Sequence, residues 1–313
     1  MDPSARVLRA GKEDGITMNT HPTLPEFDYL RPRTPAEASE FLSRHPGEAR
    51  PFLGGTDVLV RMRDGFLTPR FLVDVKGLDG TNDLRFDPRA GLTLGAAVSM
   101  NRVIGSAEVR AHYPLLAEAC RSVASYPLRT RATVVGNLCN ASPAGDTIGA
   151  CLVLDGELRV HGVHGPRQEA LGSFFLGPGK TRLEAGDVVT AIYFPLPPKG
   201  CAGVYLKLGR NQLSDLSIVG VTALGHPDSS CPSGYRFRLA LASVAPVPLV
   251  PVEAERHLAS HTIAPESLRE AAQLAADACS PIDDVRGSAQ YRRLMVRNLS
   301  AKALAQIWSR LTG

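Results

Sequence analysis

Two glycine-containing stretches hold the residues whose types and spacing could do chemistry. In Phe52–Val60 (FLGGTDVLV), Gly54 and Gly55 lie between two apolar segments that the pattern predicts to be strands. In Arg131–Asp155 (RATVVGNLCNASPAGDTIGACLVLD), β-branched residues precede Gly136, and a polar turn leads into an apolar run. A residue without Cβ lets backbone N–H groups approach a ligand closely and permits a positive φ. Because oriented N–H groups of this kind bind phosphates, the two loops together could hold one diphosphate.

The elements around the second glycine loop are expected in a definite order. Thr133–Val135 is predicted to be a strand, the polar residues from 140 to 146 a tight turn, and residues 147–154 a buried helix. Glycines between apolar runs are also typical of an ordinary hairpin or strand-to-helix turn. Neither loop by itself therefore identifies a ligand.

Three motifs taken together resemble the FAD-binding medium subunit of the xanthine dehydrogenase and carbon monoxide dehydrogenase family of molybdenum hydroxylases. LGGTD at Leu53–Asp57 is similar to the family's A-G-G-T-D-like loop, and TVVGN at Thr133–Asn137 is similar to its T-I-G-G-N. ASPAGD at Ala141–Asp146 is the third motif, and the resemblance runs from about Phe27 to the C-terminus. It implies an α+β fold with a two-lobed FAD-binding domain of the vanillyl-alcohol-oxidase/PCMH type, followed by a small C-terminal domain of antiparallel sheet and helices.

The domain organisation follows from the resemblance and from composition. Residues 1–20 are polar and aperiodic and are expected to be a disordered extension. The FAD-binding lobes are expected at 21–77 and 78–197, and a C-terminal domain of the carbon monoxide dehydrogenase flavoprotein type at 201–313. The Pro-rich segment FPLPPKG at 194–200 is typical of a link between domains.

The resemblance also implies which residues bind the cofactor. These are Leu53, Gly54, Gly55, Thr56, Asp57 and Val58 from the first loop, Thr133, Val134, Val135, Gly136 and Asn137 from the second, and Asp146, Ile192 and Lys207. Val135 stands where the family usually has its second glycine, which alters the close approach there by one side chain. Asp146 is expected to hydrogen-bond a flavin-nucleotide hydroxyl, although capping the following helix is an alternative role. Ile192 and Lys207 are expected beside the isoalloxazine ring; for Lys207 the alternative is an ordinary exposed strand lysine.

Patterning predicts the elements that position these loops. A capping box at Thr34–Glu37 opens a helix, and strands are expected at 50–53, 71–75 and 187–194. Helices are expected at 99–109, 113–124, 265–278 and 288–310, a hairpin at 157–163 with 167–171, and strands at 203–208, 216–224 and 236–244. Trp308 falls on the apolar face of the last helix, so a core position is expected rather than a cofactor contact.

Several kinds of site are disfavoured by the residues themselves. The six cysteines form no C-x-x-C pair, which argues against zinc or iron–sulfur sites and for free, mostly buried thiols. His161 and His164 are three apart on an expected strand and so face opposite sides, which disfavours a metal site. The sequence shows no paired carboxylates, Ser/His/Asp order or G-x-S-x-G motif for hydrolytic chemistry. A net charge of +4 from 35 basic and 31 acidic residues disfavours nucleic-acid binding, and no apolar run predicts a membrane span.

The function implied by the resemblance is electron transfer within a complex. FAD in this chain would receive electrons from two [2Fe–2S] clusters on a small partner subunit and pass them to NAD, a quinone or oxygen. Substrate would react at a molybdopterin cofactor on a large partner subunit, and the heterotrimer can be doubled. A cytoplasmic location is expected. Two alternatives remain: a stand-alone FAD-dependent oxidoreductase of the same superfamily, and a non-catalytic scaffold that has lost FAD, suggested only by Val135.

Overall fold

The first part of the chain forms a small parallel sheet with a helix between its strands. The computed structural model describes residues 23–211 and 215–313, so the expected extension at 1–20 lies outside the described residues. The sheet has the order β1-β3-β2, and both strand pairs are parallel. Its elements are β1 (Asp28–Leu30), α1 (Pro35–Arg44), β2 (Ala49–Phe52), α2 (Val58–Arg63) and β3 (Phe71–Asp74). The Thr34 hydroxyl caps α1 by accepting the Glu37 N–H at 3.1 Å, but Glu37 accepts from the N–H of Arg33 instead of completing the box.

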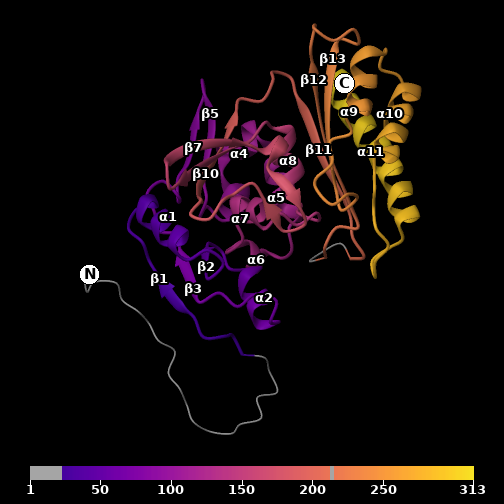
Figure 1. The fold of residues 1–313 in the computed structure, drawn as a ribbon. Helices are drawn as coiled ribbons and strands as arrows, with labels where there is room; N and C mark the ends of the chain where they lie inside the picture. The colour runs from indigo at the N-terminus through magenta and orange to yellow at the C-terminus, as the bar shows by residue number, and fades with distance from the viewer. Residues whose placement is uncertain (1–22, 212–214) are drawn as a thin grey trace.

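A larger antiparallel sheet with a cluster of short helices follows (Figure 1). Its strand order is β4-β5-β10-β6-β7, so the late strand β10 inserts into the middle of the sheet. The strands are β4 (Leu84–Asp87), β5 (Gly91–Gly95), β6 (Glu157–Gly162), β7 (Gly165–Ala170) and β10 (Val188–Pro195). The helices are α3 (Met100–Gly105), α4 (Ala107–His112), α5 (Pro114–Ser122), α6 (Tyr126–Arg129), α7 (Val134–Asn140) and α8 (Ile148–Val153). A short 3-10 turn (Leu171–Ser173) precedes the small hairpin of β8 (Phe175–Gly177) and β9 (Lys180–Thr181).

Three secondary-structure predictions were wrong in this region. Thr133–Val135 is not a strand, because the Thr133 hydroxyl accepts the Gly136 N–H at 2.9 Å and begins helix α7. The segment after the first glycine pair is helix α2 rather than a strand. The helix expected at 99–109 is divided into α3 and α4 by Ser106, whose extended backbone ends one helix and whose hydroxyl caps the next. In the first two cases a local cap or tertiary packing outweighed weak β propensity, and in the third a serine cap divided one expected helix into two.

The C-terminal part is an antiparallel sheet covered by helices on both faces. Strands β11 (Ala202–Leu208), β12 (Val219–Pro227) and β13 (Tyr235–Ala242) pair in sequence order. Helices α9 (Val252–Ser260), α10 (Pro265–Asp277) and α11 (Ala289–Thr312) cover one face, while α5 and α8 of the preceding domain lie against the other (Figure 1). Helix α9 was not predicted from the sequence. The ring centroids of Trp308 and Tyr235 lie 4.9 Å apart, and Trp308 packs against this core, which confirms the predicted core position.

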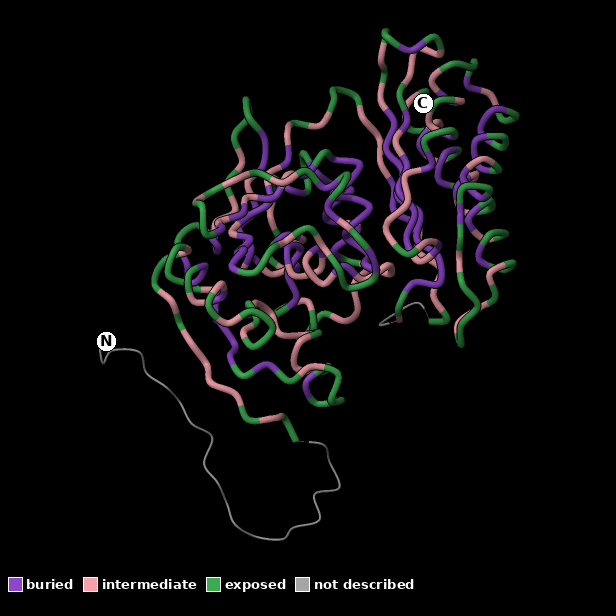
Figure 2. The backbone as a smooth tube through the Cα atoms, viewed as in Figure 1, coloured by how far each residue is buried: buried purple, intermediate pink, exposed green. Residues whose placement is uncertain are grey.

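The buried residues form two large cores that meet at the C-terminal sheet (Figure 2). One face of this sheet contributes Tyr205, Leu224 and Ala240 to the core of the preceding domain. The other face contributes residues such as Val221 and Leu239 to the core beneath α9, α10 and α11. The α+β prediction with a small C-terminal antiparallel domain is therefore confirmed, while the exact lobe boundaries stay predictions. The cysteines are free thiols, as expected.

Candidate cofactor site

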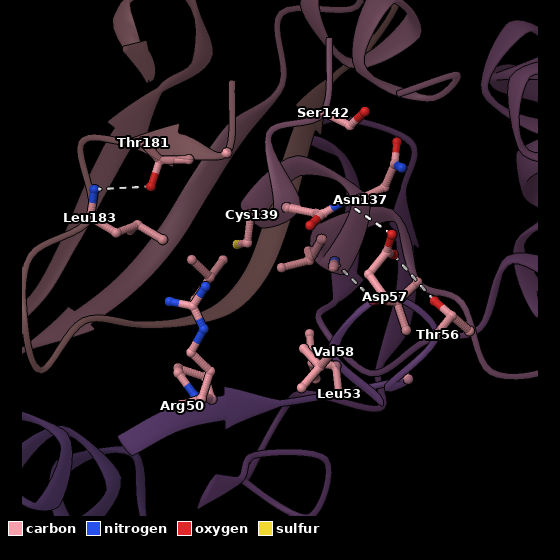
Figure 3. Close-up of a pocket in the computed structure, with 18 of the residues that line it drawn as sticks. Arg50, Leu53, Thr56, Asp57, Val58, Asn137, Cys139, Ser142, Thr181 and Leu183 are labelled. Atoms are coloured by element: carbon pink, nitrogen blue, oxygen red, sulfur yellow. Dashed lines mark hydrogen bonds between the residues drawn. The ribbon is translucent and has the colours of Figure 1, made fainter. Parts of the chain in front are cut away.

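The two glycine loops meet at one cavity of about 790 Å³ (Figure 3). Its volume falls in the range typical of cofactor pockets. The first loop forms one wall, and α7 with the polar turn after it forms another. The segment from Leu176 to Val189 closes a third side, and Asp215 and Leu216 reach the cavity from the C-terminal domain. The site is therefore assembled from elements far apart in the sequence.

The first loop owes its shape to its two glycines. Gly54 packs against the backbone of Arg131 and Ala132, so a Cβ at this position would overlap the Arg131 carbonyl group. Gly55 has φ +75°, and a Cβ there would lie 2.6 Å from the ring of Phe52. Both positions therefore require glycine, one for close backbone approach and the other also for its left-handed conformation.

The amide groups of the first loop have no partners within the described residues. No N–H from Gly54 to Asp57 donates a hydrogen bond within 23–211 and 215–313. The loop lines the cavity, where a diphosphate would supply several acceptors. This set of unpaired donors, together with the two required glycines, fits the dinucleotide expected from the sequence.

Two arginines add positive charge to the cavity wall. Arg50 on β2 reaches into the cavity between Cys139 and Leu183 (Figure 3), and Arg61 on α2 also lines it. Neither guanidinium forms a hydrogen bond or ion pair with any described residue. The pKa of Arg50 is lowered, first by burial and then by the like charge of Arg61. An anion bound between them would relieve this repulsion.

Asp146 lies at the end of the polar turn and is held by the C-terminal domain. Its Oδ1 accepts the Tyr205 hydroxyl at 2.6 Å, and its Oδ2 accepts Lys207 Nζ at 2.8 Å. Burial raises the pKa of Asp146, and the charge of Lys207 and the hydrogen bonds from Lys207 and Tyr205 partly oppose this rise. The helix that follows has Thr147 at its N-cap position without a side-chain capping bond, and the Thr147 hydroxyl donates to Asn137 Oδ1 at 2.7 Å. The capping role considered for Asp146 was therefore wrong.

Most of the residues expected at the cofactor lie at the cavity, and three do not. Those in the wall are Leu53, Gly54, Gly55, Thr56, Asp57, Val58, Thr133, Val135, Gly136, Asn137 and Asp146. Val134 and Ile192 are buried in the hydrophobic core instead, at 1% and 0% exposure. Lys207 is not in the wall either. It bonds to Asp146 and to the Ser122 carbonyl, so it is not the ordinary exposed lysine of the alternative interpretation.

Val135, the residue that replaces the usual glycine, leaves the cavity open. Although it forms part of the wall, its side chain is 1% exposed and packs into the core. Val135 is the second residue of α7, and its burial shows that its side chain points into the protein interior. The change that suggested a scaffold therefore removes little room at the site.

Sequence reasoning missed several residues of the wall. On β10 the cavity is lined by Val188 and Val189, three or more positions before the expected Ile192. Arg50 was missed because it precedes the glycine motif, and strand alternation gives no signal, since it places Arg50 on the same face as Phe52. Asp215 and Leu216 carry no motif, and only the docking of the C-terminal domain brings them to the cavity.

The segment 177–187 carries β9 and ends at an ion pair. The Asp187 carboxylate accepts two hydrogen bonds from Arg167, both at 2.6 Å, and a third from the Glu184 N–H. Asp187 itself is 7% exposed. This bidentate pair holds one end of the segment against the cavity.

Within 23–211 and 215–313, no group of three or more His, Cys, Asp or Glu side chains is arranged to hold a metal ion. None of the helices in this part of the chain is long and apolar enough to cross a membrane.

Comparison with known proteins identifies the family. Residues 25–197 match the FAD binding domain in molybdopterin dehydrogenase, and residues 204–307 match the CO dehydrogenase flavoprotein C-terminal domain. The chain is 29% identical to the carbon monoxide dehydrogenase medium chain of Hydrogenophaga pseudoflava, over 91% of this chain and 98% of that protein. It is 28% identical to a putative xanthine dehydrogenase FAD-binding subunit of Escherichia coli, over 89% of this chain and 94% of that protein.

Structure comparison agrees with the sequence matches. A solved carbon monoxide dehydrogenase from Hydrogenophaga pseudoflava, which lacks the Mo-pyranopterin moiety of its molybdenum cofactor, contains a similar chain. The TM-score is 0.87 at 29% identity, covering 92% of this chain and 99% of that chain. The chain belongs to the family of FAD-binding medium subunits of the molybdenum hydroxylases, which are oxidoreductases.

Proposed function

We propose that this chain binds FAD in the cavity and passes electrons from [2Fe–2S] clusters of a small partner subunit to an external acceptor. The observation that carries the proposal is the meeting of two glycine loops at one cavity, with four consecutive amides left unpaired among the described residues. Bound FAD would supply the redox chemistry, and the protein would supply binding, orientation and electrostatics.

The side chains and amides of this chain have separate tasks in that proposal. The N–H groups from Gly54 to Asp57 would face the diphosphate, and Arg50 and Arg61 would offset its charge. Asp146 would accept a hydrogen bond from a hydroxyl group of the nucleotide. Leu216, an exposed apolar side chain in the wall, would exclude water from the part of the cofactor nearest the C-terminal domain.

The proposed partners follow from the relatives named above. Those relatives are a medium chain and an FAD-binding subunit, that is, components of multi-subunit enzymes. We expect a large molybdopterin-binding subunit and a small subunit with two [2Fe–2S] clusters, assembled as a heterotrimer or its dimer. NAD, a quinone or oxygen would be the acceptor, and we expect the complex to work in the cytoplasm.

An absorption spectrum of the protein isolated with its native partners tests the proposal. We expect flavin bands near full occupancy, released by acid, together with broad iron–sulfur absorption that is absent from the isolated chain. A chain that stays colourless after incubation with FAD would contradict FAD binding and support the scaffold alternative.

Partner dependence separates the remaining alternative, a stand-alone FAD-dependent oxidoreductase. A subunit that needs partners should bind FAD alone but turn over substrate only within the complex. Steady turnover by the isolated flavin-loaded chain would instead favour the stand-alone enzyme.

A further inference from the structure

We propose that Tyr205 is a positioning residue of the cofactor site, which holds the carboxylate of Asp146 toward the cavity from outside it. The C-terminal sheet would thereby set the geometry of a turn in the FAD-binding domain. The inference rests on the proposed function, since Asp146 is expected to bond a hydroxyl group of bound FAD. Tyr205 itself is not part of the cavity wall.

Asp146 keeps the capacity to accept further hydrogen bonds on both oxygens of its carboxylate. Tyr205 donates to Oδ1 at 2.6 Å and Lys207 donates to Oδ2 at 2.8 Å. Lys207 is fixed in turn by the Ser122 carbonyl at 3.2 Å. Each carboxylate oxygen can accept two hydrogen bonds, so one acceptor site on each oxygen remains for a ligand. Because Asp146 lines the cavity, these remaining sites are within reach of a bound cofactor.

Tyr205 is well suited to hold another residue in place. It is 5% exposed on β11, and a Cβ added to the neighbouring Gly220 would lie 2.9 Å from its hydroxyl oxygen. Glycine at position 220 therefore leaves the room that the phenol occupies. Burial, followed by the negative charge of Asp146, raises the pKa of Tyr205 well above its ordinary value. The Tyr205 hydroxyl therefore stays protonated, and remains a hydrogen-bond donor, throughout the pH range in which proteins are usually studied.

Two other contacts show that the C-terminal sheet holds the whole turn. The Ser243 N–H donates to the Pro143 carbonyl at 2.7 Å, and the Ser217 hydroxyl donates to the Ala144 carbonyl at 3.4 Å. These bonds fix the backbone of the turn, whereas Tyr205 fixes the side chain of Asp146. Removing the Tyr205 hydroxyl should therefore change the orientation and titration of Asp146 while the turn stays in place.

The titration of Asp146 supplies a signature that loss of packing alone would not produce. In the described chain, the charged and titratable groups that act on Asp146 are Lys207 and Tyr205, and both oppose the rise in pKa caused by burial. Without the Tyr205 hydroxyl, the pKa of Asp146 should rise further. A protonated Asp146 loses an acceptor site, so FAD binding should weaken as the pH falls through this pKa. In Tyr205→Phe that weakening should begin at a higher pH.

The test is the dissociation constant of FAD for the full-length chain, measured by flavin fluorescence across a series of pH values. We expect Tyr205→Phe to weaken FAD binding about tenfold at neutral pH and to move the acid limb of the profile to higher pH. Tyr113→Phe is the matched control, because its buried hydroxyl donates to the Phe194 and Pro195 carbonyls in the same core and not to Asp146. Identical profiles for the two variants would overturn the proposal.

Asp146→Asn provides a second test, which can be made without any Tyr205 variant. This substitution removes the titrating carboxylate, so the acid limb of the profile should disappear. In the double variant with Tyr205→Phe the profile should also be flat. An acid limb that persists in Asp146→Asn would overturn the proposal even if Tyr205→Phe failed to fold. Wild-type protein that binds no FAD would instead contradict the proposed function, whereas wild-type binding without these pH effects would contradict only the role of Tyr205.

Discussion

Gly54 packs so closely against Arg131 that a Cβ on the glycine would lie 2.7 Å from the Arg131 carbonyl carbon. This contact joins the first glycine loop to the segment that leads into the second. The two motifs recognised in the sequence are therefore one structural unit, and the cavity depends on their close approach.

We expect Gly54→Ala to separate the two loops and weaken FAD binding. Overpacking of this kind costs about 1–3 kcal/mol. If this cost destabilises the FAD-bound form, the affinity falls about tenfold or more. Gly105→Ala is the control, since nothing lies within 4 Å of a Cβ built there. Isothermal titration with FAD would show the difference, and equal affinities for the two variants would argue against the role of this contact.

Arg50→Gln and Arg61→Gln should each weaken FAD binding about three- to tenfold at low ionic strength, because the cavity loses an unpaired positive charge. The loss should shrink as salt is added, since these guanidinium groups are partly exposed to solvent. Arg63→Gln on the same helix is a suitable control, because Arg63 pairs with Asp64 at 2.8 Å and lies outside the cavity wall. FAD titrations at two salt concentrations would measure the effect, and a salt-independent loss would indicate a structural cause instead.

Lys207→Gln should destabilise the chain more at pH 8 than at pH 5.5. Lys207 is the cation paired with the buried Asp146, and removing one partner of a buried pair costs about 3–5 kcal/mol. Without Lys207 the pKa of Asp146 rises, so protonation at the lower pH relieves the unpaired charge and reduces the loss. Urea unfolding of the FAD-free chain at both pH values provides the measurement. The exposed Lys199→Gln should change little at either pH, and a pH-independent loss in Lys207→Gln would contradict the pairing.

Asp74 should contribute to stability above about pH 4 and lose that contribution in acid. Burial raises its pKa, but hydrogen bonds from Lys76 and Tyr29 outweigh burial and leave the pKa below its ordinary value. A lowered folded-state pKa gives stability that is present above the unfolded-state value of about 3.9 and lost as the pH falls through the folded-state value.

Asp74→Asn should therefore lower the free energy of unfolding by about 1–3 kcal/mol at pH 7 and flatten its fall below pH 4. Asp79→Asn, at an exposed position five residues beyond the end of β3, serves as the control. Denaturant unfolding at a series of pH values would reveal both effects. An unchanged acid slope in Asp74→Asn would show that other carboxylates dominate.

The sequence by itself determined the residues that carry strong local signals. Gly54 and Gly55 cannot be replaced without strain or overlap, and the alternating residues of strand β13 and the amphipathic pattern of helix α10 indicate which faces are buried. These features depend on the chemistry of neighbouring residues, so they can be recognised before the chain is folded. The same is true of Trp308, whose place on the apolar side of α11 predicted its burial.

Only the tertiary structure decided the contacts between segments that lie far apart in the sequence. Thr133–Val135 has β propensity, yet the Thr133 cap and the burial of the two valines make the segment helical. Lys207 was expected beside the flavin, but its pairing with Asp146 depends on how β11 docks onto α5 and the polar turn. Such contacts span tens of residues along the chain and arise from packing, which leaves no periodic or compositional trace. Burial and the neighbouring groups in the folded protein determine the positions that these side chains take.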